Sequence, residues 1–265
     1  MAKLTDSQNE NDYQPNPDYE HEIKLTLSEK NAHERDIHIK FEETGHKYSI
    51  KGDTSFVSVT TWLKKFFEPF NSDLIIDRMM RSPKWPNNKY FGMTKQNIKN
   101  LWRQNGDEAA RLGTAMHKSI EDFYNGEKIE YDSFEMKCFE EFVIDHPLVP
   151  YRTEWTVYDE ELKLCGSIDM TFINEDGSLS IYDWKRCKSM DLQSDFNKYA
   201  LAPIQTVPDT NYWHYTIQLN AYKTIIERNY GFKVKELVLI AIHPELDKTY
   251  QKFVVPFMDI DHLFI

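Results

Sequence analysis

The residues best suited to chemistry lie in one stretch of the chain, from Gly166 to Lys185. This stretch holds Gly-Ser-Ile-Asp ending at Asp169, an apolar run, the turn-forming sequence Asn-Glu-Asp-Gly at 174–177, and then Asp183-Trp-Lys. Side chains two residues apart on a strand point to the same face, so Asp183 and Lys185 should project together. Two carboxylates and an ammonium group on one hairpin are half of a hydrolytic metal site.

The length of the turn decides whether Asp169 joins Asp183. A three-residue loop at 175–177, with Gly177 in the left-handed conformation and a bulge after it, would place the two carboxylates opposite each other. A two-residue or four-residue loop would send them to opposite faces of the sheet. Opposed carboxylates repel unless a cation or a proton lies between them, so the first register predicts a bound metal ion. The alternative is that Asp169, Asp183 and Lys185 are solvated residues on an exposed face of the sheet.

The elements that position these residues are predicted from periodicity and from helix and turn signals. Helices are predicted over 58–67, 107–125, 133–145 and 209–228, and the stretch between the first two is predicted to be largely helical, with interruptions at Pro83 and Pro86. Strands are predicted over 35–41, 46–51, 151–158, 162–173, 178–186, 235–243 and 250–256. The connection over 187–209 is long for a compact domain, which indicates a mobile or functional segment. The pattern predicts an α/β fold with a mixed, mostly antiparallel central sheet flanked by helices.

Composition sets the broad class of the protein. A chain of 265 residues with 40% hydrophobic content can bury one core, and we predict a single domain over 31–265 preceded by a disordered acidic tail over 1–30. No window reaches the length of a membrane span, and the tail does not have the pattern of a signal peptide. The three cysteines have no C-x-x-C spacing and are too few for a four-thiolate zinc or iron-sulfur site. These features are typical of a soluble intracellular protein with reduced thiols.

The segment over 62–111 reverses the acidic balance of the chain, whose formal net charge is −11. It carries ten lysines and arginines against five acidic residues, with eight aromatic residues interleaved. Because basic side chains contact phosphates and aromatic rings stack on bases, the segment predicts contact with nucleic acid. The alternative is that most of the aromatic residues are core and the charges form a solvated helical surface.

Two helices carry further polar side chains. His117 and Glu121 are four residues apart and therefore share one face of their helix, where the histidine could add a nitrogen ligand to an oxygen-rich site. Tyr215, Gln218 and Tyr222 share a face of a later helix, and a buried amide there needs hydrogen-bonding partners. Glu154, on the first of the central strands, is a weaker candidate for the site, since an exposed glutamate often forms an ordinary salt bridge.

Taken in order, these motifs resemble the RecB-type branch of the PD-(D/E)xK nuclease superfamily, and within it the mitochondrial genome maintenance exonucleases and related phage and viral nucleases. The motifs are Gly113 to His117 with Glu121, Gly166 to Asp169, Asp183 to Lys185, and Gln218 to Tyr222. The resemblance implies a restriction-endonuclease-like core and a metal-dependent DNA exonuclease that acts on single strands or free ends in replication, recombination or repair. The alternatives are a structure-selective endonuclease that cuts flaps or junctions and a catalytically silent nucleic-acid-binding protein.

The resemblance also implies roles for individual residues. Mg²⁺ or Mn²⁺ would be bound by His117, Asp169, Asp183 and the backbone carbonyl of Trp184. Lys185 would act on the attacking water, and we also predict a catalytic role for Glu121. The predicted substrate contacts are Gln218, Tyr222, Tyr215, Arg186 and Arg111. The chain departs from the family at Arg186, where a threonine or serine is frequent, and it has no four-cysteine iron-sulfur module.

Overall fold

The computed structural model describes residues 25–42, 45, 47–129, 131–194, 197–246 and 248–264. Most of the predicted acidic tail lies outside the described residues. Its last part does not, because α1 (Leu27–Lys30) is a one-turn helix capped by Thr26, and Leu27 is buried. Residues 27–30, within the stretch predicted as tail, are therefore helical. Within the described ranges, no helix is both long and apolar enough to cross a membrane.

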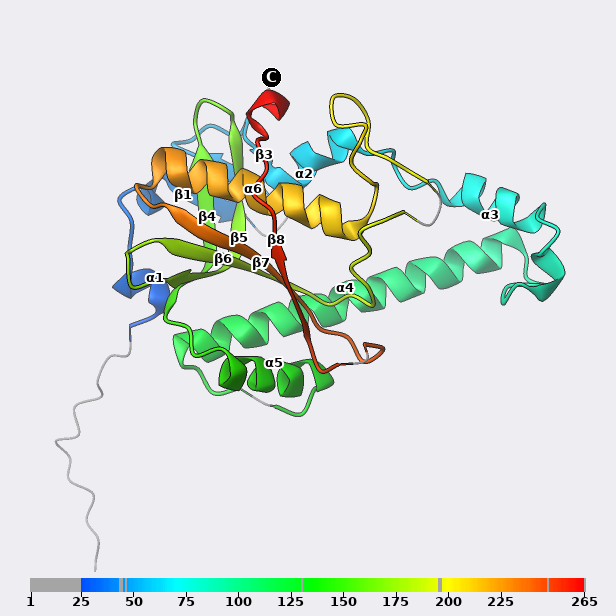
Figure 1. Cartoon of the computed structure of the whole chain (residues 1–265), viewed down its shortest axis with the longest axis horizontal. Helices are drawn as coiled ribbons and strands as arrows, with labels where there is room; N and C mark the ends of the chain where they lie inside the picture. The colour runs from blue at the N-terminus through cyan, green and yellow to red at the C-terminus, as the bar shows by residue number, and fades with distance from the viewer. Residues whose placement is uncertain are drawn as a thin grey trace, which may run out of the picture.

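A six-stranded mixed sheet forms the centre of the fold (Figure 1). Its strands are β3 (Val57–Ser58), β4 (Pro150–Asp159), β5 (Leu164–Ile173), β6 (Leu179–Lys185), β7 (Val234–Ala241) and β8 (Gln251–Val255). The pairs β4–β5, β5–β6 and β7–β8 are antiparallel, whereas β3–β5 and β6–β7 are parallel. A separate hairpin pairs β1 (Ile39–Glu42) with β2 (Lys47–Ile50). The predicted α/β class with a mixed, mostly antiparallel sheet is confirmed.

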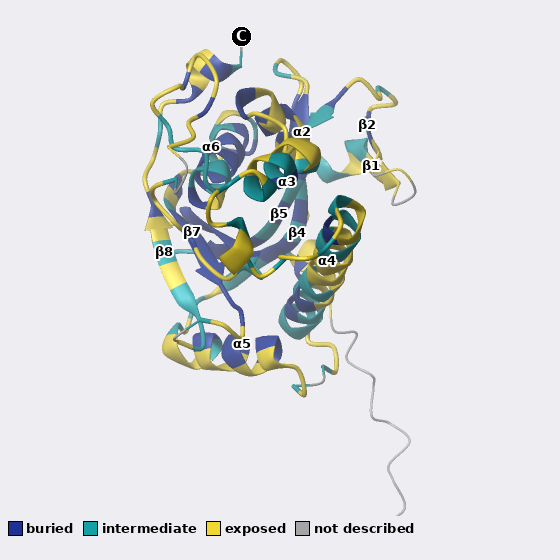
Figure 2. Cartoon of the chain, turned by 90° about the vertical axis from the view of Figure 1, so that its right-hand side faces the viewer, coloured by how far each residue is buried: buried dark blue, intermediate teal, exposed yellow. Residues whose placement is uncertain are grey.

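Helices cover both faces of this sheet (Figures 1 and 2). On one face, α2 (Val59–Leu63) and α6 (Asn211–Asn229) pack on the larger hydrophobic cluster, which includes Ile181 and Leu239. On the other face, α4 (Lys95–Asn125) and α5 (Phe134–Asp145) contribute to a second cluster that includes Tyr182. Alternate residues of β6 and β7 enter different clusters, as the period of a strand requires.

The predicted turn between β5 and β6 is confirmed. The Gly177 N–H donates to the carbonyl of Asn174 at 2.9 Å, and Gly177 has φ +78°. The strands pair from Ile173↔Leu179 to Met170↔Tyr182. This is the three-residue loop with a left-handed glycine, and its register ends at Met170↔Tyr182, one residue before Asp169 and Asp183.

Helix α4 begins at Lys95, twelve residues before the predicted start. Its first half belongs to an arm, defined here as residues 68–106, that projects from the body with α3 (Ser72–Met80) and the short 3₁₀ turn η3 (Trp85–Asn87) (Figure 1). The amino group of Lys95 lies 2.8 Å from Asp77 and ties α4 to α3. Residues 103–111 are exposed on all sides and separate the buried Ile98 from the apolar stripe that begins at Leu112, so periodicity did not join the two parts into one helix.

Gly166 on β5 is required by the side chain of Tyr222 on α6. A Cβ atom at Gly166 would lie 2.8 Å from the Tyr222 hydroxyl oxygen and 2.9 Å from a ring carbon. We therefore expect Gly166→Ala to lower the free energy of unfolding by about 1–3 kcal/mol, as overpacking of a core does, measured by urea denaturation. Gly113→Ala on α4 is the matched control, since nothing lies within 4 Å of its added Cβ, and it should be neutral or stabilising. Equal stability of the two variants would contradict this assignment.

Candidate metal centre

The candidate site lies where the sheet opens between β5 and β6. One edge of β5 is occupied by β4, so β6 and β3 share the other edge. Pairing with β6 ends at Met170, and pairing with β3 covers only Leu164 and Cys165. The stretch between them, 166–169, has no strand partner on that edge. Asp169 bridges the opening, because its carboxylate accepts a hydrogen bond from the Trp184 N–H at 2.9 Å.

Glu154 on β4 is turned toward the same opening by an irregular backbone. The pairs Thr153↔Met170 and Trp155↔Ile168 leave Glu154 and Asp169 opposite each other. Glu154 has φ +43°, a left-handed conformation that is rare for a residue other than glycine. The side chains of β5 change faces here, since Ile168 enters the cluster beneath α6 whereas Met170 enters the cluster beneath α4 and α5. A regular strand would keep residues two apart on one face.

His117 on α4 completes a group of three potential metal ligands. Its Nδ1 lies 3.7 Å from Glu154 Oε1 and 3.6 Å from Asp169 Oδ2, and its Nε2 lies 2.8 Å from the carbonyl oxygen of Trp184. One ligand atom from each of His117, Glu154 and Asp169 lies within 4.8 Å of the others. Burial disfavours the charged imidazolium, but the carboxylates, Asp169 foremost, outweigh it and raise the pKa of His117 to about 9. The site thus attracts a positive charge.

Asp183 and Lys185 lie next to this group on β6. The Lys185 ammonium is 2.5 Å from Asp183 Oδ2, and the Asp183 side chain is almost fully buried. Burial raises the pKa of Asp183 to about 6, against the opposing effect of the Lys185 charge. Burial works against the Lys185 charge as well, but Asp183 and Asp169 outweigh it and raise the pKa of Lys185. Lys185 is therefore a cation, suited to donating hydrogen bonds.

Three residues of α6 surround the pair from one side, as the spacing along that helix predicted. The Gln218 side-chain amide donates to Asp183 at 3.4 Å, a long hydrogen bond. The ammonium of Lys185 lies 4.7 Å from the centre of the Tyr215 ring. Tyr222 is buried against Gly166, one turn farther along the helix from Gln218. These contacts hold Asp183 and Lys185 in place.

Three predicted site residues are placed elsewhere. Glu121 forms an ion pair with Lys118 at 3.2 Å and is not part of the ligand group. Arg186 is half-buried on the opposite face from Lys185, where it pairs with Glu135 at 2.7 Å. Arg111 is bound to Glu108 on its own helix at 2.8 Å. The two arginines therefore already have carboxylate partners, and the phosphate contacts predicted for them remain untested.

The donor set fits a divalent cation. Two carboxylates and one imidazole match the preferences of Mg²⁺ or Mn²⁺, with the nitrogen ligand better suited to Mn²⁺. Asp183 Oδ2 is buried, and the Lys185 ammonium lies 2.5 Å from it. Glu154 is the potential ligand that the sequence indicated least strongly. Its only signal was its place on the strand before Gly166, because a left-handed residue within a strand leaves no mark in hydrophobic periodicity.

Comparison with known proteins adds little to this geometry. No protein-family model matches the chain, and no curated protein matches it. One solved structure with detectable similarity, from Eubacterium rectale, is described as a "Putative exonuclease". It is 15% identical in sequence, the match covers 79% of this chain and 74% of that chain, and the TM-score is 0.32. At this TM-score the similarity says nothing about the site.

Proposed function

We propose that the protein is a metal-dependent nuclease that hydrolyses phosphodiester bonds in DNA. The observation that carries the proposal is the convergence of His117, Glu154 and Asp169 within 4.8 Å, beside a half-buried lysine paired with Asp183. An exposed sheet face would not gather ligands from a helix and two strands around an unpaired strand edge. The order of these residues along the chain, and the resemblance to the RecB-type nucleases that it carries, favour the same function.

The residues divide the work as follows. His117, Glu154 and Asp169 would hold the ion, and the Trp184 carbonyl lies 2.8 Å from His117 Nε2. A bound Mg²⁺ or Mn²⁺ would stabilise negative charge on the phosphate and make a hydroxide nucleophile available near neutral pH. Lys185 would donate a hydrogen bond to the attacking water or to a phosphate oxygen and offset the charge that develops there. Asp183 and Tyr215 fix the direction of that ammonium group.

An exonuclease acting on single strands or free ends is the form of this function that the resemblance favours. End-labelled single-stranded and double-stranded DNA, incubated with Mg²⁺, Mn²⁺ or a chelator, would test it. We expect metal-dependent release of short products from linear single strands by the wild-type protein and none by Asp183→Asn. Cleavage of a circular single strand would instead identify an endonuclease, and absence of cleavage with either metal would refute the proposed function.

A further inference from the structure

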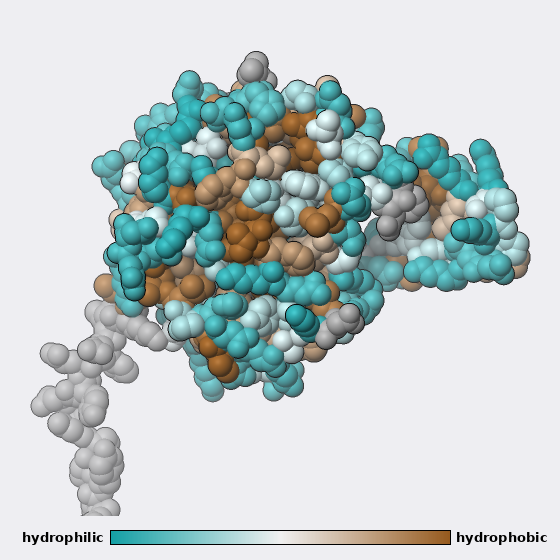
Figure 3. Space-filling view, viewed as in Figure 1, coloured by the Kyte–Doolittle hydropathy of each residue, from teal (hydrophilic) through white to brown (hydrophobic). Residues whose placement is uncertain are grey.

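A groove of about 1140 Å³ lies between the arm and the connection that follows β6. Residues 68–75 line it at the base of the arm, Arg78, Lys84 and Trp85 line it farther out, and Lys198 lines it from the connection. The arm stands apart from the body, and hydrophobic side chains, brown in Figure 3, reach its surface among hydrophilic ones. From the 187–209 connection, which the sequence predicts to be either mobile or functional, Lys198 contributes to the lining of this groove.

The charges of the groove are unbalanced in favour of positive charge. Within the part of the chain that the structure describes, Arg78, Lys84 and Lys198 form no ion pair, and all three are exposed. Asp73 is neutralised by Lys95 and Lys99, at 3.1 and 2.8 Å. Glu68 is then the remaining acidic residue of the lining. Unpaired cations that line a concave surface attract a polyanion.

The groove also exposes aromatic and aliphatic surface. The Phe70 side chain is 72% exposed and Leu74 is 46% exposed. Phe70 is supported from behind by Trp102, with 6.0 Å between ring centres, and Trp85 is supported in the same way by Phe91 at 6.0 Å. Rings held by a neighbouring ring present a fixed surface at little entropic cost. Aromatic rings of this kind, beside cations, are the elements that bind unpaired bases and their phosphates.

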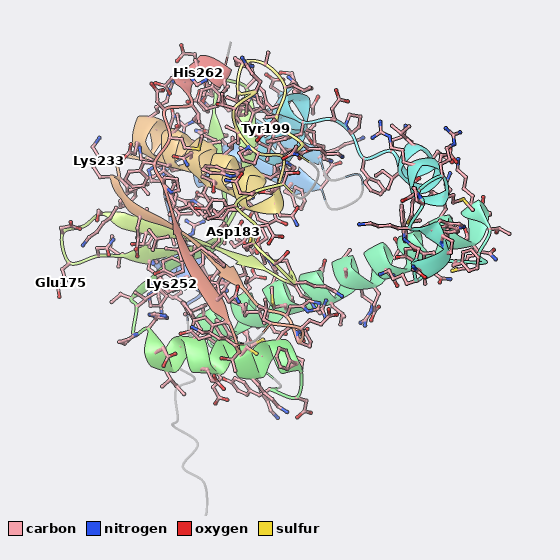
Figure 4. All side chains as sticks on the ribbon, turned by 45° about the vertical axis from the view of Figure 1, so that its right-hand side comes forward. Glu175, Asp183, Tyr199, Lys233, Lys252 and His262 are labelled. Atoms are coloured by element: carbon pink, nitrogen blue, oxygen red, sulfur yellow. The ribbon has the colours of Figure 1, made fainter. Side chains whose placement is uncertain are left out.

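We propose that this groove binds a single-stranded segment of nucleic acid, with bases on Phe70 and Trp85 and phosphates on Arg78, Lys84 and Lys198. This proposal depends on the proposed function in one respect: the bound single-stranded nucleic acid is taken to be part of the molecule that the nuclease hydrolyses. Asp183 and Tyr199, the neighbour of Lys198, both lie in the part of the body that faces the arm (Figure 4). Because Arg186 and Arg111 already pair with carboxylates, the arm is the better source of phosphate contacts. A duplex would bind less well, since its bases are stacked on each other and cannot stack on the rings.

Fluorescence anisotropy with the full chain, a labelled oligothymidylate of about 20 nucleotides and a chelator tests the groove without cleavage. Replacing both rings, Phe70→Ala with Trp85→Ala, should raise Kd about tenfold or more, because stacking contributes about 1–3 kcal/mol per base. Phe257→Ala is the matched control, since its ring is 51% exposed and lies outside the groove, and it should bind as the wild type does. Thermal melts followed by circular dichroism verify that each variant is folded.

A second pair of variants tests the charges. Arg78→Gln with Lys84→Gln should reduce the slope of log K against log salt by about 1.4, or about 0.7 for each lost phosphate contact. Lys233→Gln, on the side of the body away from the arm, should leave the slope unchanged (Figure 4). Three results would refute the proposal that the groove binds a single strand. They are an unchanged affinity of the Phe70→Ala, Trp85→Ala variant, an unchanged salt slope of the Arg78→Gln, Lys84→Gln variant, and equal affinity of the wild type for a blunt duplex.

The groove and the nuclease can fail separately. A wild-type protein that binds the oligonucleotide through Phe70 and Trp85 but cleaves nothing with either metal would keep the groove and refute the nuclease. If the wild-type protein cleaves DNA and its ring variant binds the oligonucleotide as tightly as the wild type does, the proposed role of the groove is refuted and the nuclease is not.

Discussion

Replacing Lys185 by alanine should lower the rate of DNA hydrolysis at saturating substrate by at least ~10²-fold, the typical effect of removing an electrostatic or proton-transferring group. The structure gives the reason. Lys185 is the ammonium group beside the ligand cluster, held by Asp183 at 2.5 Å and by the Tyr215 ring. Because the side chain is not among the three clustered ligands, metal binding should persist. Single-turnover cleavage of end-labelled DNA measures the rate, and anisotropy measures the affinity.

A nearby lysine supplies the control. Lys188 follows three residues later, is 62% exposed and pairs with Glu245 on the surface. Lys188→Ala should therefore cleave DNA at the wild-type rate. Full activity of Lys185→Ala would exclude the proposed role of the lysine. A loss of affinity without a loss of turnover would instead assign Lys185 to substrate binding.

Asp169→Asn should remove most of the stabilisation that a divalent cation gives to the folded protein. An ion present at a hundred times its Kd stabilises the native state by about 2.7 kcal/mol, which for a domain of this size raises Tm by about 5–10 °C. Changes to outer ligand-supporting groups weaken metal binding about 10–100-fold, so loss of a direct ligand should weaken it by more than ~10². Melting curves with Mn²⁺ and with a chelator measure the difference.

The matched control lies on α4, one turn from His117. Glu121 carries a carboxylate but pairs with Lys118 outside the ligand group. Glu121→Gln should therefore retain the full shift in Tm with Mn²⁺, whereas Glu154→Gln should lose it along with Asp169→Asn. A Glu121 variant that lost the shift, with Glu154→Gln unaffected, would place Glu121 in the site, where a catalytic role was predicted for it, and would remove Glu154 from the site.

Most of the helices, strands and turns could be predicted from local sequence signals. The turn at 174–177 could be predicted from its polar residues and glycine, whereas its length was left open, and the structure has the three-residue loop with Gly177 left-handed. Helix ends followed the same kind of rule, since Ser133 caps α5 with its side chain and Gly126 ends α4 in the left-handed conformation.

The features that escaped prediction depend on distant contacts. The start of α4 at Lys95 could not be located within the predicted helical region, because it depends on contacts such as the ion pair of Lys95 with Asp77 on α3 and on the burial of Ile98. The two-residue strand β3 exists only because Val57 and Ser58 lie beside β5. Arg186 was predicted to contact a phosphate, but in the fold it pairs with Glu135 on α5. Each of these depends on which segments meet in space, and periodicity within one segment does not report that.

Helix α4 runs without interruption from Lys95 to Asn125, and it carries Trp102 behind the groove and His117 at the ligand cluster. Fifteen residues separate these two positions, which at the rise of an α-helix is a spacer of roughly 22 Å. An oligonucleotide that contacts both the groove and the ligand cluster has to span that distance. We therefore expect a minimum substrate length, below which an oligonucleotide contacts one of the two sites and not the other.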